Sequence, residues 1–183
     1  IMAVFVDPDT QDFFESGQIR TKYSSTETVS SVGALQHPLL RAILTRLNLG
    51  TGLEISSIAD VPSGTGMGSS SSFTVGTLHN LMARIGRSDE ATKAWLAEQA
   101  CAVELGDLGE PIGKQDQYAA AFGGFNIFRF HGDERVSVAP VDLPDPEGWL
   151  RHLRLYYLGN QRSASAILAE QSRESATRSK QEV

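Results

Sequence analysis

The chain has 183 residues, which suits one domain or one domain and a fraction, and it is long enough to bury a core without metals or disulfides. Sixteen Lys and Arg against 22 Asp and Glu give a formal net charge of −6 at pH 7, so we expect no nucleic-acid partner, because phosphate-backbone binding depends on clustered cations. The single cysteine, Cys101, excludes an intramolecular disulfide and fits a cytoplasmic protein. No apolar run approaches the roughly 18–20 residues of a membrane span, and we expect no membrane partner.

The spacing of apolar residues predicts a mixture of strands and helices. In chain order we expect a strand at 2–6, a strand at 19–25, a helix that opens at His37-Pro38 and ends before Gly50, a strand at 53–58, a helix at 69–86, a helix capped by Ser88 that ends near 105–106, a short helix at 115–122, a hairpin of 125–130 and 136–141, a strand at 153–158 and a helix at 163–173. Strands and helices do not alternate strictly, which favours an α+β fold.

Three prolines, Pro140, Pro144 and Pro146, indicate a border between two domains, which we expect at 1–148 and 149–183. The chain opens with Ile1 in a strand-like run and closes on a polar run. We therefore expect both domains to be truncated pieces of a longer protein. Four aromatic residues are expected in the core, namely Trp95, Phe125, Phe128 and Phe130.

The most unusual stretch, residues 62–72, has glycines at three alternate positions, then four serines, then an amphipathic helix. Glycines let the backbone take left-handed angles and approach a ligand closely, and a helix start offers unpaired N–H groups to an anion. The stretch therefore predicts a phosphate cradle. A flexible Gly/Ser linker is the alternative, although the stretch lies between apolar segments. No Gly-Lys-Ser/Thr follows the glycines, and their G-x-G-x-G spacing differs from the dinucleotide-binding pattern.

This stretch, Pro62-x-x-x-Gly66-Met67-Gly68-Ser69-Ser70-Ser71, resembles the second conserved motif of the GHMP kinases, P-x-x-x-G-L-G-S-S-A/S. Residues 113–124, GKQDQYAAAFGG, resemble the sugar-kinase branch typified by D-glycero-D-manno-heptose 7-phosphate kinase, and so do residues 36–38 and 162–165. The family's first and third Gly-rich motifs are missing here. The resemblance implies that 1–148 is a GHMP kinase N-terminal ATP-binding domain, similar to domain 2 of ribosomal protein S5. It implies that 149–183 begins a ferredoxin-like C-terminal domain.

The resemblance also implies two cofactors, ATP and Mg²⁺, and a set of residues that handle them. The residues expected to bind ATP are Pro62, Gly64, Thr65, Gly66, Met67, Gly68, Ser69, Ser70 and Ser71. Ser70 and Glu104 would bind Mg²⁺, whose shell tolerates few protein ligands because phosphates and water fill the rest. Either Asp107 or Glu110 could replace Glu104 in this role.

Phosphoryl transfer also needs a group that orients the acceptor hydroxyl and takes its proton. By resemblance this group is Asp116, with Lys114 helping to keep it ionised; a helix-capping aspartate and a solvated lysine are the alternatives. Arg162 could grip a sugar phosphate with two hydrogen bonds, or be an ordinary surface arginine.

The resulting expectation is ATP-dependent phosphorylation of a sugar or sugar phosphate. The candidate acceptor is D-glycero-D-manno-heptose 7-phosphate, at its anomeric hydroxyl, for the synthesis of nucleotide-activated heptose. Another sugar kinase of the branch, such as a fucokinase-like one, is the alternative among enzymes. A non-catalytic GHMP-like binding protein is the alternative outside them, and a homodimer is left open.

Overall fold

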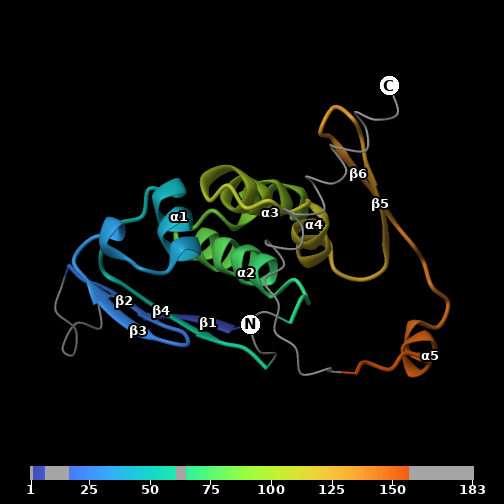
Figure 1. Cartoon of the computed structure of the whole chain (residues 1–183), viewed down its shortest axis with the longest axis horizontal. Coiled ribbons are helices and arrows are strands. Elements are labelled where there is room, and N and C mark those ends of the chain that lie inside the picture. The colour runs from blue at the N-terminus through green and yellow to red at the C-terminus, as the bar shows by residue number, and fades with distance from the viewer. Residues whose placement is uncertain (1, 7–16, 61–64, 157–183) are drawn as a thin grey trace, which may run out of the picture.

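The computed structural model describes residues 2–6, 17–60 and 65–156 of the chain (Figure 1). Its main sheet has four strands in the order β1-β4-β2-β3. These strands are β1 (Met2–Val6), β4 (Leu53–Ile58), β2 (Ile19–Lys22) and β3 (Thr26–Val29). The β1–β4 and β2–β3 pairs are antiparallel, whereas β2 and β4 are parallel. A parallel pair needs a long crossover, and here β3 and the first helix provide it.

The main helices lie on one face of this sheet (Figure 1). They are α1 (Pro38–Arg46), α2 (Ser69–Arg84), α3 (Lys93–Cys101) and α4 (Gln115–Phe122), with a π-helix at Ala102–Asp107 that continues α3. The short 3-10 turns Val32–Ala34 and Ser88–Glu90 lie between them. Apolar side chains from the sheet and the helices form one continuous core, which includes Ile19, Ile43, Ile55, Leu78 and Val103. Mixed strands and helices with little alternation confirm the α+β prediction.

Local capping explains where α1 and α3 begin. His37 precedes α1, and its Nδ1 accepts a hydrogen bond of 3.4 Å from the amide of Leu40. The cap of α3 is Thr92, whose hydroxyl accepts from the amide of Trp95 at 3.2 Å. The prediction that Ser88 caps this helix was therefore wrong. Ser88 begins the 3-10 turn instead, and α3 starts after the next residue with a cap-forming hydroxyl.

The second sheet is a hairpin of β5 (Asn126–Phe130) and β6 (Val136–Pro140), at the right of Figure 1. One face of it packs on a small cluster around Ala97, Cys101 and Tyr118, to which Phe128 contributes. The other face is open, and Ile127 on it is 61% exposed. Phe125 and Phe130, both expected in the core, are 38% and 48% exposed, although Phe130 lies on the same face as Phe128 and its ring contacts Tyr118. Trp95 is partly buried against the main core.

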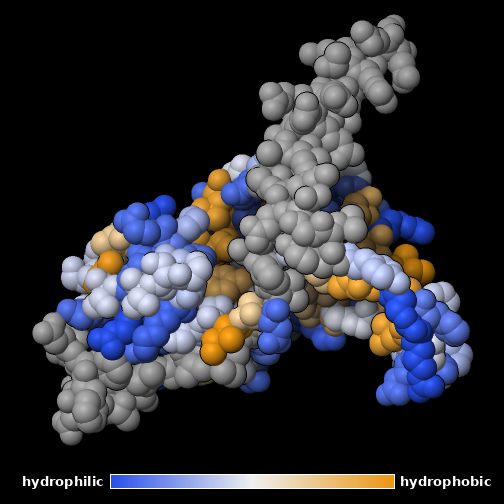
Figure 2. Space-filling model, turned by 60° about the horizontal axis from the view of Figure 1, so that its bottom comes forward, coloured by the Kyte–Doolittle hydropathy of each residue, from blue (hydrophilic) through white to orange (hydrophobic). Residues whose placement is uncertain are grey.

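The chain then forms α5 (Pro146–Arg151), which the sequence did not predict and which Asp145 caps. The domain border expected after residue 148 falls inside this helix. Residues 153–156 are not part of a strand, so the strand predicted at 153–158 is wrong over its described part. The helix predicted at 163–173 lies outside the described residues. Apolar surface is visible at the right of Figure 2. Ile127 in the hairpin and Trp149 and Leu150 in α5 are exposed. Within the described ranges, no helix combines the length and the apolarity needed to cross a bilayer.

Candidate active site

The glycine loop leads directly into α2. Gly66 and Gly68 both have left-handed backbone angles, with φ of +73° and +66°, and Gly68 is the N-cap of the helix. L-residues rarely adopt these angles, so glycine is favoured at both positions. The first backbone hydrogen bond of α2 runs from the amide of Ser72 to Gly68 O, at 2.9 Å. The amides of residues 69–71 therefore have no acceptor within the helix. Together with the helix dipole, these amides form a site suited to an anion such as phosphate.

Only some of the other residues expected to bind ATP lie in the described part of the chain. Thr65 and Met67 lie in the described loop, and Met67 is 50% exposed. Pro62 and Gly64, which the sequence also assigned to ATP, lie outside the described residues, as does Arg162.

Asp116 lies against the glycine loop although it is distant in the sequence. A β-carbon added to Gly68 would lie 3.3 Å from Asp116 Cγ and 3.4 Å from its Oδ2. Asp116 is the second residue of α4 and its side chain is exposed. The two motifs that suggested a kinase therefore meet, with a carboxylate beside the N-terminus of α2. A phosphate bound there would bring its acceptor within reach of that carboxylate.

Glu104 is buried beside this junction, with only 1% of its surface exposed. Its Oε2 accepts from Ser71 Oγ at 2.8 Å and from the side-chain amide of Gln117, and its Oε1 lies 2.8 Å from Thr74 Oγ1. The same Thr74 hydroxyl lies 2.9 Å from the carbonyl oxygen of Ser70. Glu104 therefore links the π-helix to both α2 and α4.

The donor set around Glu104 fits a magnesium ion. Within the described residues, the hydrogen-bond partners of this carboxylate are all neutral, and a buried charge is costly unless a cation or metal compensates it. Ser70, the other expected ligand, is exposed in the first turn of α2 and is linked to Glu104 through Thr74. No group of three or more His, Cys, Asp or Glu able to hold a metal occurs in the described part of the chain. Phosphates and water would thus complete the shell, as Mg²⁺ tolerates.

The two alternative metal ligands are placed differently. Asp107 is paired with Arg46, so its carboxylate is already occupied. Glu110 is exposed, and its backbone amide donates to Glu104 O at 2.9 Å. Of the three acidic candidates, Glu104 alone is buried beside α2, and this position favours Glu104 as the metal ligand.

Lys114 does not form a described contact with Asp116. Its ammonium group pairs with the carboxylate of Glu134 and donates to the Glu134 carbonyl at 3.0 Å. Hydrogen bonding to Glu134 raises the pKa of Lys114. Glu134 lies in the β5–β6 turn with a φ of +68°, so this contact ties the turn to the start of α4.

Four features of this region were not predicted from the sequence: Arg46, Thr74, Gln117 and the pairing of Ser71 with Glu104. Two of them carried a signal, since Ser71 and Thr74 are three residues apart and so share a face of α2. Gln117 lies in the second motif, but nothing in its spacing indicated burial. Arg46 acts across the fold and left no local pattern.

The family described as GHMP kinases N terminal domain matches residues 33–124, which include the glycine loop, Glu104 and Asp116. The chain belongs to the GHMP kinase family. This confirms the resemblance and the N-terminal-domain fold that it implied. The roles of individual site residues stay predictions.

Several relatives of this GHMP kinase are sugar kinases by name. It is 32% identical to D-glycero-alpha-D-manno-heptose 7-phosphate kinase of Campylobacter jejuni in an alignment of 154 residues, and the match covers 76% of this chain and 40% of the relative. A crystal structure of a D-glycero-D-manno-heptose 1-phosphate kinase from Bacteroides thetaiotaomicron matches with a TM-score of 0.66 and 26% identity, over 81% of this chain and 49% of that one. A putative sugar kinase from Campylobacter jejuni matches with a TM-score of 0.66 and 27% identity, over 81% and 45%. The chain thus spans less than half the length of each.

Proposed function

We propose that this chain is the nucleotide-handling part of an ATP-dependent sugar kinase. The proposed acceptor is a sugar phosphate, with D-glycero-D-manno-heptose 7-phosphate, phosphorylated at its anomeric hydroxyl, as the first candidate. The observation that carries the proposal is the close approach of Asp116 to Gly68, which brings an exposed carboxylate to the N-terminus of α2. The names of the relatives support the acceptor class. An ATP-consuming sugar kinase belongs in the cytoplasm, where a buried, unpaired Cys101 stays reduced.

The glycine loop and the first turn of α2 would hold the triphosphate of ATP. The amides of residues 69–71, which have no acceptor within the helix, and the helix dipole favour negative charge, and the glycines let the backbone approach it. We include the rest of the expected set in this role, namely Pro62, Gly64, Thr65 and Met67. Glu104 and Ser70 would hold Mg²⁺, which when bound neutralises charge on the phosphates.

Asp116 would orient the acceptor hydroxyl and accept its proton as the hydroxyl oxygen bonds to the γ-phosphorus of ATP. The bond from that phosphorus to the oxygen bridging the β- and γ-phosphates would break, and ADP would leave with the bridging oxygen. Lys114 would act indirectly, because its ion pair with Glu134 holds the start of α4, the helix that carries Asp116. Arg162 would bind the phosphate already present on the sugar. A binding protein without catalytic activity has no chemical need for both Asp116 and Glu104, which favours an enzyme over that alternative.

The test is ADP release by the full-length protein with a panel of acceptors. The panel contains heptose 7-phosphate, heptose 1-phosphate, hexose phosphates and free sugars, fucose included, because the names of the relatives differ in the phosphate position. We expect turnover with a sugar phosphate and little with free sugars. ATP hydrolysis that no sugar stimulates would contradict a sugar kinase, and a preference for fucose would select the fucokinase-like alternative.

Asp116→Asn tests the site itself. It keeps the shape of the side chain but removes the base, so turnover should fall roughly 10²- to 10⁴-fold while ATP affinity is kept. The matched control is Asp89→Asn, an exposed aspartate beyond the far end of α2, a helix of 16 residues and so about 24 Å long. Wild-type turnover in Asp116→Asn would remove Asp116 from the mechanism.

A further inference from the structure

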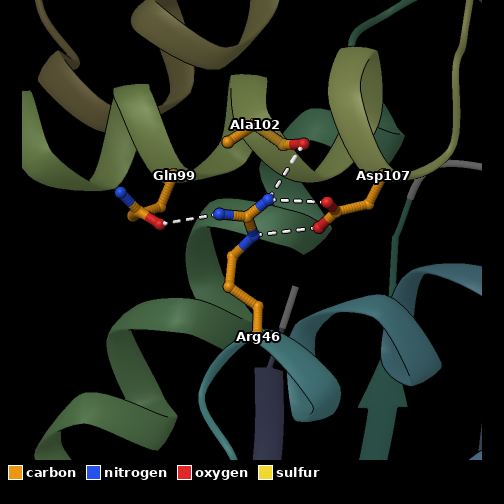
Figure 3. A network of polar contacts seen from close by, with 4 residues as sticks. All are labelled: Arg46, Gln99, Ala102 and Asp107. Atoms are coloured by element: carbon orange, nitrogen blue, oxygen red, sulfur yellow. Dashed lines mark hydrogen bonds and ion pairs between the residues drawn. The ribbon is translucent and has the colours of Figure 1, made fainter.

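Arg46, the last residue of α1, contacts the segment that carries Glu104 (Figure 3). Its Nε donates to Asp107 Oδ2 at 2.9 Å, and its Nη2 donates to Asp107 Oδ1 at 2.7 Å. Nη2 also lies 3.4 Å from the carbonyl oxygen of Ala102, and Nη1 lies 3.5 Å from Gln99 Oε1. One guanidinium group therefore joins the last turn of α3 to both ends of the π-helix.

A π-helix is an unusual way to continue an α-helix, and such turns often occur at functional sites. Here the amide of Leu108 donates to Val103 O at 3.0 Å, five residues back. If the segment returned to α-helical bonding, its residues would shift by one position, and a side chain would turn by about 100°. Glu104 would then point away from Ser71 and Thr74, the residues it contacts on α2.

Stability alone does not account for the Arg46–Asp107 pair. Its side chains are 28% and 37% exposed, and ion pairs at such positions contribute about 0–1 kcal/mol. What distinguishes the pair is its geometry. The planar fork of arginine binds a carboxylate with two bonds and reaches a carbonyl as well, which specifies a backbone arrangement that a lysine could not.

The chain offers a matched pair for comparison. Arg87 and Glu90 form a similar two-bond pair, with Nε–Oε1 at 2.7 Å and Nη2–Oε2 at 2.6 Å. Both partners lie in the turn after α2, three residues apart, and are about half exposed. Like the Arg46 pair it is an arginine fork at the surface, but it connects no element to Glu104.

We propose that Arg46 is a positioning residue for the metal-binding carboxylate. By holding the Ala102 carbonyl and the Asp107 carboxylate together, it fixes the π-helical register that directs Glu104 toward α2. The inference rests on the proposed function, in which Glu104 holds Mg²⁺. Outer-shell partners of metal ligands affect metal affinity roughly 10- to 100-fold, and the expected effect of losing Arg46 has this size.

The experiment compares Arg46→Lys and Asp107→Asn with Arg87→Lys in the full-length protein. Binding of Mn²⁺ in the presence of ADP is measured by electron paramagnetic resonance, and the Mg²⁺ requirement is measured by turnover at saturating ATP and sugar. We expect Arg46→Lys and Asp107→Asn to weaken Mn²⁺ binding about 10-fold or more. We expect excess Mg²⁺ to restore most of the turnover, and metal-free ADP affinity and melting temperature to stay near wild type. Arg87→Lys should change none of these.

A double variant separates positioning from a general loss of structure. In a Glu104→Gln background, Arg46→Lys should cause no further loss of Mn²⁺ affinity, because the ligand it positions is already gone. Unchanged Mn²⁺ affinity in folded Arg46→Lys and Asp107→Asn would overturn the inference, and so would an equal loss in Arg87→Lys. A wild-type protein that binds Mn²⁺ with ADP, shows the shift in Arg46→Lys and yet phosphorylates no sugar would refute the proposed function and leave the inference standing. A wild-type protein that binds no Mn²⁺ with ADP would overturn both.

Discussion

Gly68→Ala tests whether Asp116 and the glycine loop act together. An alanine at this position must keep a φ of +66°, and left-handed angles cost an L-residue roughly 1–2 kcal/mol. In a chain of this size, 1 kcal/mol corresponds to about 2–4 °C in melting temperature, so we expect a decrease of about 2–8 °C.

The second effect of Gly68→Ala falls on Asp116. The new β-carbon would lie 3.3 Å from Asp116 Cγ, tighter than ordinary contact, so the carboxylate must move by a few tenths of an ångström. Because Asp116 is exposed, its side chain can move without disturbing α4. A misplacement of about 1 Å can cost 10²-fold in rate, so this smaller shift should reduce turnover by roughly 3- to 10-fold.

Gly66→Ala is the matched control. It has the same kind of strain, with a φ of +73°, but its β-carbon would meet nothing within 4 Å. The assay is turnover at saturating ATP and sugar, with melting curves for both variants. We expect similar melting temperatures and a lower turnover in Gly68→Ala. Equal turnover in the two variants would mean that Asp116 is not held against Gly68 in the active protein.

Three further predictions concern other groups. Glu104→Gln keeps the side-chain volume but replaces a buried acceptor with an amide that faces the donors of Ser71 and Thr74. Chemical unfolding should therefore show a decrease of about 1–3 kcal/mol in the free energy of unfolding, and turnover should need more Mg²⁺. Wild-type behaviour in both measurements would remove Glu104 as a buried ligand. Burial lowers the pKa of His37 in the folded protein. At pH values between this lowered pKa and the unfolded value of about 6.5, the unfolded chain binds more protons than the folded protein, so the stability falls as the pH falls. Melting at pH 7.5 and 5.5 should therefore differ less in His37→Asn, which can still cap α1, and an unchanged difference would assign the effect to another group. Burial raises the pKa of the Cys101 thiol to about 11, so a disulfide reagent at pH 8 should react slowly with native protein and quickly after unfolding, and rapid native reaction would contradict that burial.

Elements with local signals could be predicted from the sequence. The strand Leu53–Ile58 and the helix Gln115–Phe122 have the predicted bounds, and α2 begins at the predicted residue. Each has glycine at or near a boundary, and a glycine there constrains the backbone whatever the rest of the chain does. The cap of α3 was less determined, because Ser88 and Thr92 both precede the apolar pattern and either could have capped the helix.

The partner of Glu104 illustrates a signal that was present but not extended far enough. The resemblance implied that Glu104 and Ser70 bind one Mg²⁺, and this stays a prediction; the serine that hydrogen-bonds to Glu104 in the structure is the next residue, Ser71. Successive helix residues point about 100° apart, so only one of the two can share the buried face. Ser71 lies four residues before Val75 and seven before Leu78, which continues the apolar face of α2 back to its first turn. Ser70 lies off that face and stays exposed.

Other features depend on contacts that no local pattern carries. Lys114 lies two residues before Asp116, and this closeness suggested that the two charges interact. The structure pairs Lys114 with Glu134 instead, because the β5–β6 hairpin folds back to the start of α4. The π-helix depends in the same way on Arg46, which reaches it from α1. Charge and spacing along the chain indicate which groups are available, but only the packing of elements decides which of them meet.

Helix α4 connects the two carboxylates on which the proposed chemistry depends. Asp116 and Gln117 are neighbours on it, yet Asp116 is exposed against Gly68 and Gln117 is fully buried with its amide on Glu104. A rotation or shift of α4 would therefore move Asp116, the carboxylate proposed to bind the acceptor, and at the same time disturb Glu104, the carboxylate proposed to bind the metal. Arg46 fixes Glu104 from the π-helix side, and Lys114 fixes the start of α4 from the hairpin side. Such support matters because phosphoryl transfer depends mainly on positioning, so residues that never touch the substrate can still set the rate.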